Sequence, residues 1–171
     1  DFSYTYSYNR LGNLTSRTGT DPDMTYTYGT PGGTPAVTGG PQAVTRVDNS
    51  VGEDWSYDYD ARGNLDGKYV GTTLTYDYTF DVEGRLASVK TNNQTTTFAY
   101  DADGQRVLTT RPDGTVVYTP FPDYEVEDPP TGDNITRTTY RIAGQIVAVQ
   151  KRVGTGAGTF AYTYSDHLGN I

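Results

Sequence analysis

The chain has 171 residues, with 20 glycines, 16 tyrosines, no cysteine and a formal net charge of −8. The lack of cysteine excludes disulfides, thiolate metal sites and a cysteine nucleophile. The negative charge argues against nucleic-acid binding, which needs Lys and Arg to neutralise phosphates. With no run of about 18 apolar residues, the sequence predicts no membrane span.

The first predicted strand lies at the N-terminal end, where Tyr4, Tyr6 and Tyr8 alternate with small polar residues. Such alternation is typical of a strand with one buried face. Asn9 and Gly12 then predict a turn into a returning strand. A second alternating stretch at 24–28 runs into residues 29–41, which are too rich in Gly and Pro for a strand and predict a long surface loop.

One phrase recurs between residues 55 and 117: aromatic, any residue, aromatic, Asp, two variable residues, Gly. Its glycines recur at intervals of 21 and 20 residues. The aromatics predict a strand, and Asp-x-x-Gly predicts a type I turn whose glycine takes positive φ and begins the returning strand with a bulge. A period near twenty predicts a stacked array of hairpins. The copies are Tyr57, Tyr59, Asp60, Gly63; Tyr78, Phe80, Asp81, Gly84; and Phe98, Tyr100, Asp101, Gly104.

The remainder is less regular. We expect short strands at 116–118, 124–126 and 138–142, an acidic loop at 125–133, and a strand at 146–149 buried on both faces. Lys151 to Gly158 predicts a flexible connection. Phe160, Tyr162 and Tyr164 predict a last strand, followed by a turn at Asp166 and Gly169. The sequence therefore divides into a hairpin array at 1–118, including the loop at about 29–41, and irregular repeats at 119–171.

The phrase Tyr-x-Tyr-Asp-x-x-Gly-Asn/Arg-Leu resembles the YD repeat of Rhs proteins, of toxin-complex C components and of teneurins. Copies at 6–14, 57–65, 78–86 and 98–107 extend the resemblance over nearly the whole chain. Residues 164–170 are similar to the opening of the Rhs-associated core, near the C-terminal end of such arrays. The resemblance implies an all-β fold of tandem hairpins in a curved or spiralling antiparallel sheet, a segment of a hollow shell.

The same resemblance implies a role. In bacterial members the shell encloses a C-terminal toxic domain, and in teneurins it supports cell-surface adhesion. We therefore expect a structural scaffold, secreted or at the cell surface, whose partners are neighbouring repeats of a longer chain and an enclosed toxin. The alternative is an extracellular adhesion or carbohydrate-binding module that assembles into filaments through its strand edges.

No residue is expected to serve in catalysis or to bind a metal or cofactor, and the chain is not expected to be an enzyme. Asp60, Asp81 and Asp101 are interpreted as turn formers rather than calcium ligands, because no bidentate Glu follows at the required spacing. His167, the single histidine, is interpreted as structural. The tyrosines are interpreted as a buried sheet face rather than a sugar platform. The expected site is thus the repeat motif itself: the copies above with Tyr6, Tyr8, Asn9, Gly12, Tyr162, Tyr164, Asp166 and Gly169.

Overall fold

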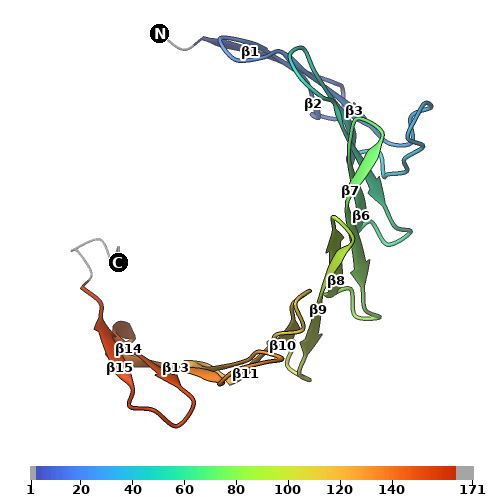
Figure 1. The fold of residues 1–171 in the computed structure, drawn as a ribbon. Coiled ribbons are helices and arrows are strands. Elements are labelled where there is room, and N and C mark those ends of the chain that lie inside the picture. The colour runs from blue at the N-terminus through green and yellow to red at the C-terminus, as the bar shows by residue number, and fades with distance from the viewer. Residues whose placement is uncertain (1–2, 165–171) are drawn as a thin grey trace. The chain divides into compact units, whose positions relative to one another are not determined.

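The computed structural model describes residues 3–164, so the predicted turn at Asp166 and Gly169, and His167, lie outside the described residues. The described chain is all-β, as predicted. It forms one antiparallel sheet in which the order of the strands follows their order in the chain (Figure 1). The strands are β1 Tyr4–Tyr8, β2 Leu14–Gly19, β3 Met24–Tyr28, β4 Val44–Asn49, β5 Trp55–Tyr59, β6 Leu65–Val70, β7 Thr73–Phe80, β8 Leu86–Thr91, β9 Gln94–Tyr100, β10 Arg106–Thr110, β11 Val116–Phe121, β12 Tyr124–Asp128, β13 Ile135–Ile142, β14 Gln145–Val153 and β15 Thr159–Tyr162.

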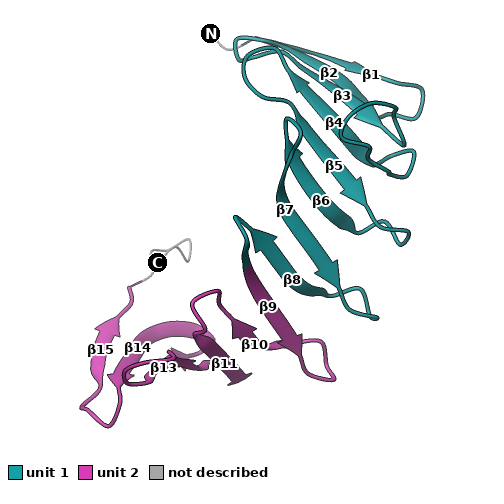
Figure 2. Cartoon of the chain, turned by 45° about the vertical axis from the view of Figure 1, so that its right-hand side comes forward, with its two compact units in different colours: residues 1–94 teal, residues 95–171 magenta. Residues whose placement is uncertain are grey.

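Two compact units divide the chain at residues 94 and 95 (Figure 2). Unit 1, residues 1–94, holds β1 to β8. Unit 2, residues 95–171, holds most of β9 and all of β10 to β15. The boundary between the two units lies earlier in the chain than residue 118, where we predicted a change from regular to irregular repeats. That predicted change describes the regularity of the sequence, so it stays a prediction.

Tight turns join the hairpins where the sequence offers residues that accept positive φ. Asn92 and Asn93, with φ of 50° and 60°, join β8 to β9. Ala143 and Gly144, with φ of 50° and 83°, join β13 to β14. Two positive φ values in succession match the right-handed twist of the flanking strands, which is why Asn and Gly are favoured there.

The described units bury few side chains, because the sheet lacks a second layer over most of its area. Val47, Val117 and Ala148 are buried strand residues, and Val37 is buried in the Gly- and Pro-rich loop. Of the predicted strand 146–149, only Ala148 is buried, so the expectation of burial on both faces is wrong. Among residues 3–164, no helix is long and apolar enough to cross a membrane.

Two predicted loops begin later than predicted, because their first residues belong to strands, whereas residues 129–134 and 154–158 are irregular as expected. Glu125, Glu127 and Asp128 lie in β12 rather than in an acidic loop, and Lys151 with Arg152 lies in β14 rather than in a flexible connection. In both places partner strands continue the ladder: β12 pairs with β11 and β13, and β14 pairs with β13 and β15. The last predicted strand is shorter than expected, since Tyr164 lies beyond the end of β15.

Candidate functional surface

The turn at Asp60 shows how each repeat closes. The Asp60 carboxylate oxygen Oδ1 accepts hydrogen bonds from the backbone N–H groups of Arg62 at 2.8 Å and Asn64 at 2.9 Å. Oδ2 accepts one from the Asn64 side-chain amide at 2.9 Å. Gly63 donates its N–H to the Asp60 carbonyl at 3.0 Å and has a φ of 87°, which only glycine adopts without strain. Both carboxylate oxygens of Asp60 are therefore engaged within its own turn.

The other copies repeat this geometry. Asp81 Oδ1 accepts from the N–H groups of Glu83 and Arg85, Asp101 Oδ1 from those of Asp103 and Gln105, and Asn9 Oδ1 from those of Leu11 and Asn13. Gly12, Gly84 and Gly104 have φ values of 81°, 81° and 80°. Each turn contains the expected bulge at its glycine: in the turn at Asp60, Gly63 donates its N–H to the Asp60 carbonyl and Asp60 donates its N–H to the Asn64 carbonyl at 2.9 Å. The ladder also shifts register within a few residues of each turn.

Hydrogen bonding keeps two of these carboxyl groups ionised. The Asn64 side chain and backbone, with the Arg62 backbone, hold the pKa of Asp60 below its ordinary value. At Asp81, partial desolvation acts to raise the pKa, but hydrogen bonds from the backbone and guanidinium of Arg85 outweigh it and lower the pKa. These carboxylates serve the turns. Among residues 3–164, no three His, Cys, Asp or Glu side chains are grouped so as to hold a metal ion.

One side chain links successive turns of unit 1. The Arg62 guanidinium nitrogen Nη1 donates to the carbonyl of Asp81 at 3.1 Å and to that of Val82 at 3.2 Å. Arg62 occupies a variable position of the motif, so only the long-range contact reveals its role. The turn at Asp60–Asn64 is thereby tied to the turn at Asp81–Arg85.

The aromatic residues of the motif differ in exposure. Tyr57, Tyr59 and Tyr78 are half-buried, and burial, with smaller effects from neighbouring tyrosines, raises the pKa of each phenol. Tyr59 donates its hydroxyl to the Val44 carbonyl at 2.9 Å, and Tyr78 stacks on Tyr76 at a ring separation of 6.0 Å. In the first and last strands and just beyond, however, the rings are exposed: Tyr6 by 49%, Tyr8 by 63%, Tyr162 by 68% and Tyr164 by 86%. The prediction that the tyrosines form a buried sheet face therefore does not hold for these outer residues.

Charged side chains form a second feature, in unit 2. The Glu127 carboxylate accepts from Arg111 at 2.7 Å and from Arg137 at 2.8 Å, while Arg137 also reaches Glu125 at 2.6 Å. Hydrogen bonds from Arg137 and then Arg111 lower the pKa of Glu127. These contacts join the turn after β10 to β12 and β13. They come from residues far apart in sequence, so the acidic composition alone could not reveal them.

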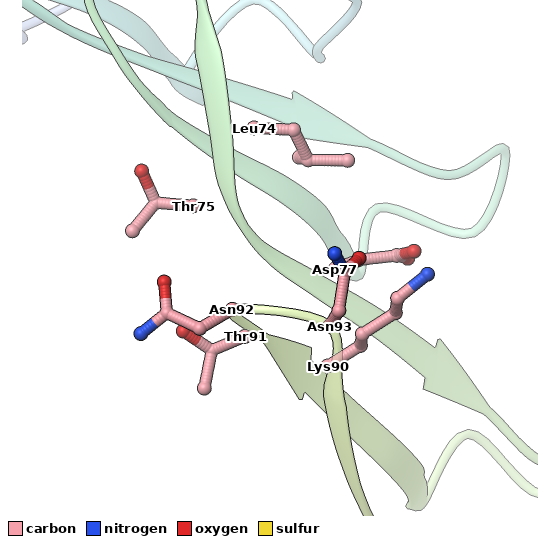
Figure 3. A pocket seen from close by; sticks show the side chains of 7 residues that line it. All are labelled: Leu74, Thr75, Asp77, Lys90, Thr91, Asn92 and Asn93. Atoms are coloured by element: carbon pink, nitrogen blue, oxygen red, sulfur yellow. The ribbon is translucent and has the colours of Figure 1, made fainter.

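The hollows of the surface are small or open. A cavity of about 110 Å³ lies in unit 1 between β7, β8 and the turn that follows (Figure 3). Its lining is Leu74, Thr75, Asp77, Lys90, Thr91, Asn92 and Asn93. Sites for organic ligands usually enclose roughly 300–1,000 Å³, so this cavity is too small for one. A wider hollow of about 550 Å³ separates Thr38 to Gly40 from the turn at 60–63.

Comparison with known proteins finds a family with a similar repeat sequence and solved structures with a similar fold. Residues 80–116, which include the turns at Asp81 and Asp101, match the RHS Repeat family model. The fold is similar to the crystal structure of TcdB2-TccC3, with a TM-score of 0.58, 13% identity, and coverage of 93% of this chain and 12% of that chain. The structure of TcdB2-TccC3 without its hypervariable C-terminal region gives a TM-score of 0.43 at 16% identity, over 98% of this chain and 12% of that chain. No curated protein sequence matches significantly.

The fold and its turns define a repeat protein whose unit is the YD hairpin. Residues 80–116 carry an Rhs repeat and the fold of the chain is similar to that of TcdB2-TccC3, and both findings confirm the resemblance seen in the sequence. The chain spans about an eighth of the TcdB2-TccC3 chain to which it is similar, since it covers 12% of that chain.

Proposed function

We propose that this chain is one stretch of the wall of a larger Rhs-repeat shell, and that the wall encloses or presents a secreted toxin or other effector. The observation that carries the proposal is the fold similarity between 93% of this chain and a segment of TcdB2-TccC3. The described side chains agree with a structural role, because the Asp60 and Asp81 carboxylates are engaged in closing turns rather than aimed at a common centre. Such a wall has no reaction of its own and acts outside the cell that makes it.

Electron microscopy of the full-length protein, combined with protease treatment, tests the shell. We expect a closed hollow particle whose C-terminal region survives digestion until the particle is unfolded. A solid or extended particle, or a C-terminal region digested as fast as a free peptide, would contradict the proposal.

A second candidate is adhesion or self-assembly, with carbohydrates or further copies as partners. Two features of the outer strands favour it. They carry exposed aromatic side chains, and among the described residues β1 pairs only with β2 and β15 only with β14. A strand edge with unpaired backbone groups is a template for another strand. Filaments of full-length protein in sedimentation and microscopy, or retention on a glycan array through the tyrosines, would support this candidate. A monodisperse, non-binding particle would exclude it.

A further inference from the structure

The loop between β3 and β4 takes the place of a repeat turn. Residues 29–43 connect these strands where the other odd–even pairs of unit 1 use Asn9–Asn13, Asp60–Asn64 and Asp81–Arg85. The loop is closed at its base, since Gly29 donates its N–H to the Ala43 carbonyl at 3.2 Å. Asn13 of the neighbouring turn donates its side-chain amide to the Pro41 carbonyl at 3.0 Å. The loop is thus held on the side of β1 and β2 by one hydrogen bond.

On the other side the loop completes the pairing of β5. Strand β4 pairs with β5 only at Arg46 with Ser56 and at Val47 with Trp55, so the last residues of β5 extend beyond that ladder. Tyr59 donates its N–H to the Thr38 carbonyl at 3.0 Å, and the Thr38 hydroxyl lies 3.0 Å from the Tyr59 carbonyl. Thr38 therefore acts as the partner that β4 does not supply.

Asp58 and Arg46 anchor this arrangement. The Asp58 oxygen Oδ1 accepts from the Thr38 N–H at 2.7 Å and lies 2.8 Å from its hydroxyl. Arg46 donates from its guanidinium to the carbonyls of Thr34 and Pro35. A carboxylate and a guanidinium from the sheet thus each hold backbone groups of the loop, and charge-assisted hydrogen bonds of this kind are stronger than neutral ones.

All the buried side chains in the described part of unit 1 lie in the loop or in the two strands that it contacts. The four buried side chains of this part of unit 1 are Val37 at 1% exposure, Thr45 at 0%, Val47 at 4% and Ser56 at 3%. Val37 lies in the loop, and the other three lie in β4 or β5. A Cβ added at Gly39 would lie 2.6 Å from the Thr45 methyl group and 3.2 Å from the Tyr59 ring. The loop therefore covers this part of the sheet as a second layer.

We propose that residues 29–43 form a latch over the edge of β5 that β4 leaves unpaired, and that the latch opens as a local unit while β5 to β8 stay paired with one another. Its contacts with β4 and β5 run through side chains and one backbone hydrogen bond, from Tyr59 to Thr38. By contrast, β6, β7 and β8 are joined to one another by ladders of four residue pairs each. The inference rests on these contacts and is independent of what the larger protein encloses. Opening would expose Val37 together with the β4-facing edge of Asp58 and Tyr59, which stay paired with β6 on their other side.

Hydrogen exchange of the full-length protein, read by mass spectrometry on peptides from 29–43, 55–60 and 65–91, tests the latch. Gly39→Ala should force the loop off Thr45 and raise exchange at Thr38 and Tyr59 by about tenfold or more. Gly40→Ala is the matched control, since no atom lies within 4 Å of its added Cβ, and it should leave exchange unchanged. In both variants β6 to β8 should keep their protection.

A second pair of variants tests the latch independently, in case Gly39→Ala misfolds. Asp58→Ala removes the anchor and should raise exchange in the same two peptides, whereas Asp77→Ala, which removes a carboxylate paired opposite Gly67 in the neighbouring ladder, should not. Unchanged exchange in both Gly39→Ala and Asp58→Ala would overturn the latch. An equal rise over β6 to β8 would also overturn it, because the loop would then open only with the whole unit.

Discussion

Asn9 and Asp60 accept the same pair of backbone hydrogen bonds, one through an amide and the other through a carboxylate. The chain thus contains its own comparison between a charged and a neutral turn former. Both residue types bond their own backbone two residues further on, which is why they favour turns. Asp60 differs in its charge, which makes stability depend on pH, and in the bond that its Oδ2 accepts from the Asn64 side chain.

Asp60→Asn should keep the turn and remove its contribution to acid sensitivity. Because the folded pKa of Asp60 lies below its ordinary value, its stabilisation is present above the unfolded pKa of about 4 and is lost as the pH falls through the lower folded pKa. Thermal unfolding between neutral and strongly acidic pH should therefore be flatter for Asp60→Asn than for the native protein. Asp60→Ala should lower the melting temperature at every pH. An Asn variant with the native acid slope would contradict this account.

Ala143 is the turn residue whose conformation suits its side chain least. Its φ of 50° lies in the left-handed region, which costs an L residue other than Gly, Asn or Asp roughly 1–2 kcal/mol. Ala143→Gly should therefore raise the free energy of unfolding by about 0.5–1 kcal/mol after the entropy of glycine is counted. Ala102→Gly, in a turn position without positive φ, should lower it by a similar amount. Denaturant unfolding of both variants checks the sign.

At the scale of the strands, the sequence predicts those structural features that depend on residues close together in the chain. Alternating aromatics and Asp-x-x-Gly predict the hairpins of β5 to β10 because both the strand and its turn are specified within a few residues. The pairing of Glu127 with Arg111 and Arg137 is not predictable in this way, since it depends on which strands become neighbours. Pro129 and Pro130 indicate a loop, and the extension of the predicted strand 124–126 to Asp128 is seen only with β11 and β13 in place.

The loop at 29–41 shows the same limit. Its Gly and Pro content predicts irregular backbone, which is what the structure contains. That Val37 would be buried and Thr38 would pair with Tyr59 could not be inferred, because the anchors Arg46 and Asp58 belong to strands on either side of a gap in the β4–β5 ladder. The only local signal is Gly39, whose lack of a side chain permits close approach.

Glu127→Gln should destabilise unit 2 by roughly 1 kcal/mol, since it weakens two charge-assisted hydrogen bonds of which one partner, Arg111, is largely exposed. The loss should shrink in high salt, because screening already weakens the native contacts. Glu83→Gln is the control: its carboxylate is 57% exposed and its bond to Arg85 is 3.2 Å long, so little change is expected. Thermal unfolding at low and high salt measures both. A loss at Glu127 that is independent of salt would contradict the ionic interpretation.

At the scale of the whole molecule, both units bury few side chains and are built from sequential hairpins. Repeat arrays of this kind gain much of their stability from neighbouring units. We therefore expect residues 3–164 expressed alone to exchange their amide hydrogens faster than the same residues in the full-length protein, most of all in β1 and β15. Equal protection in the two settings, measured by hydrogen exchange, would show that the segment is self-sufficient.

The loop at 29–43 also shows that a hairpin of this sheet tolerates a long insertion at its tip. The strands before and after it keep their register from Thr27 with Arg46 to Met24 with Asn49, and each doubling of a flexible loop costs only about 0.6 kcal/mol. An engineer could therefore exchange a short tip such as Asn9–Asn13 for an epitope or a fluorophore-binding peptide. The graft would report the position of this segment in the assembled protein without breaking the wall that carries it.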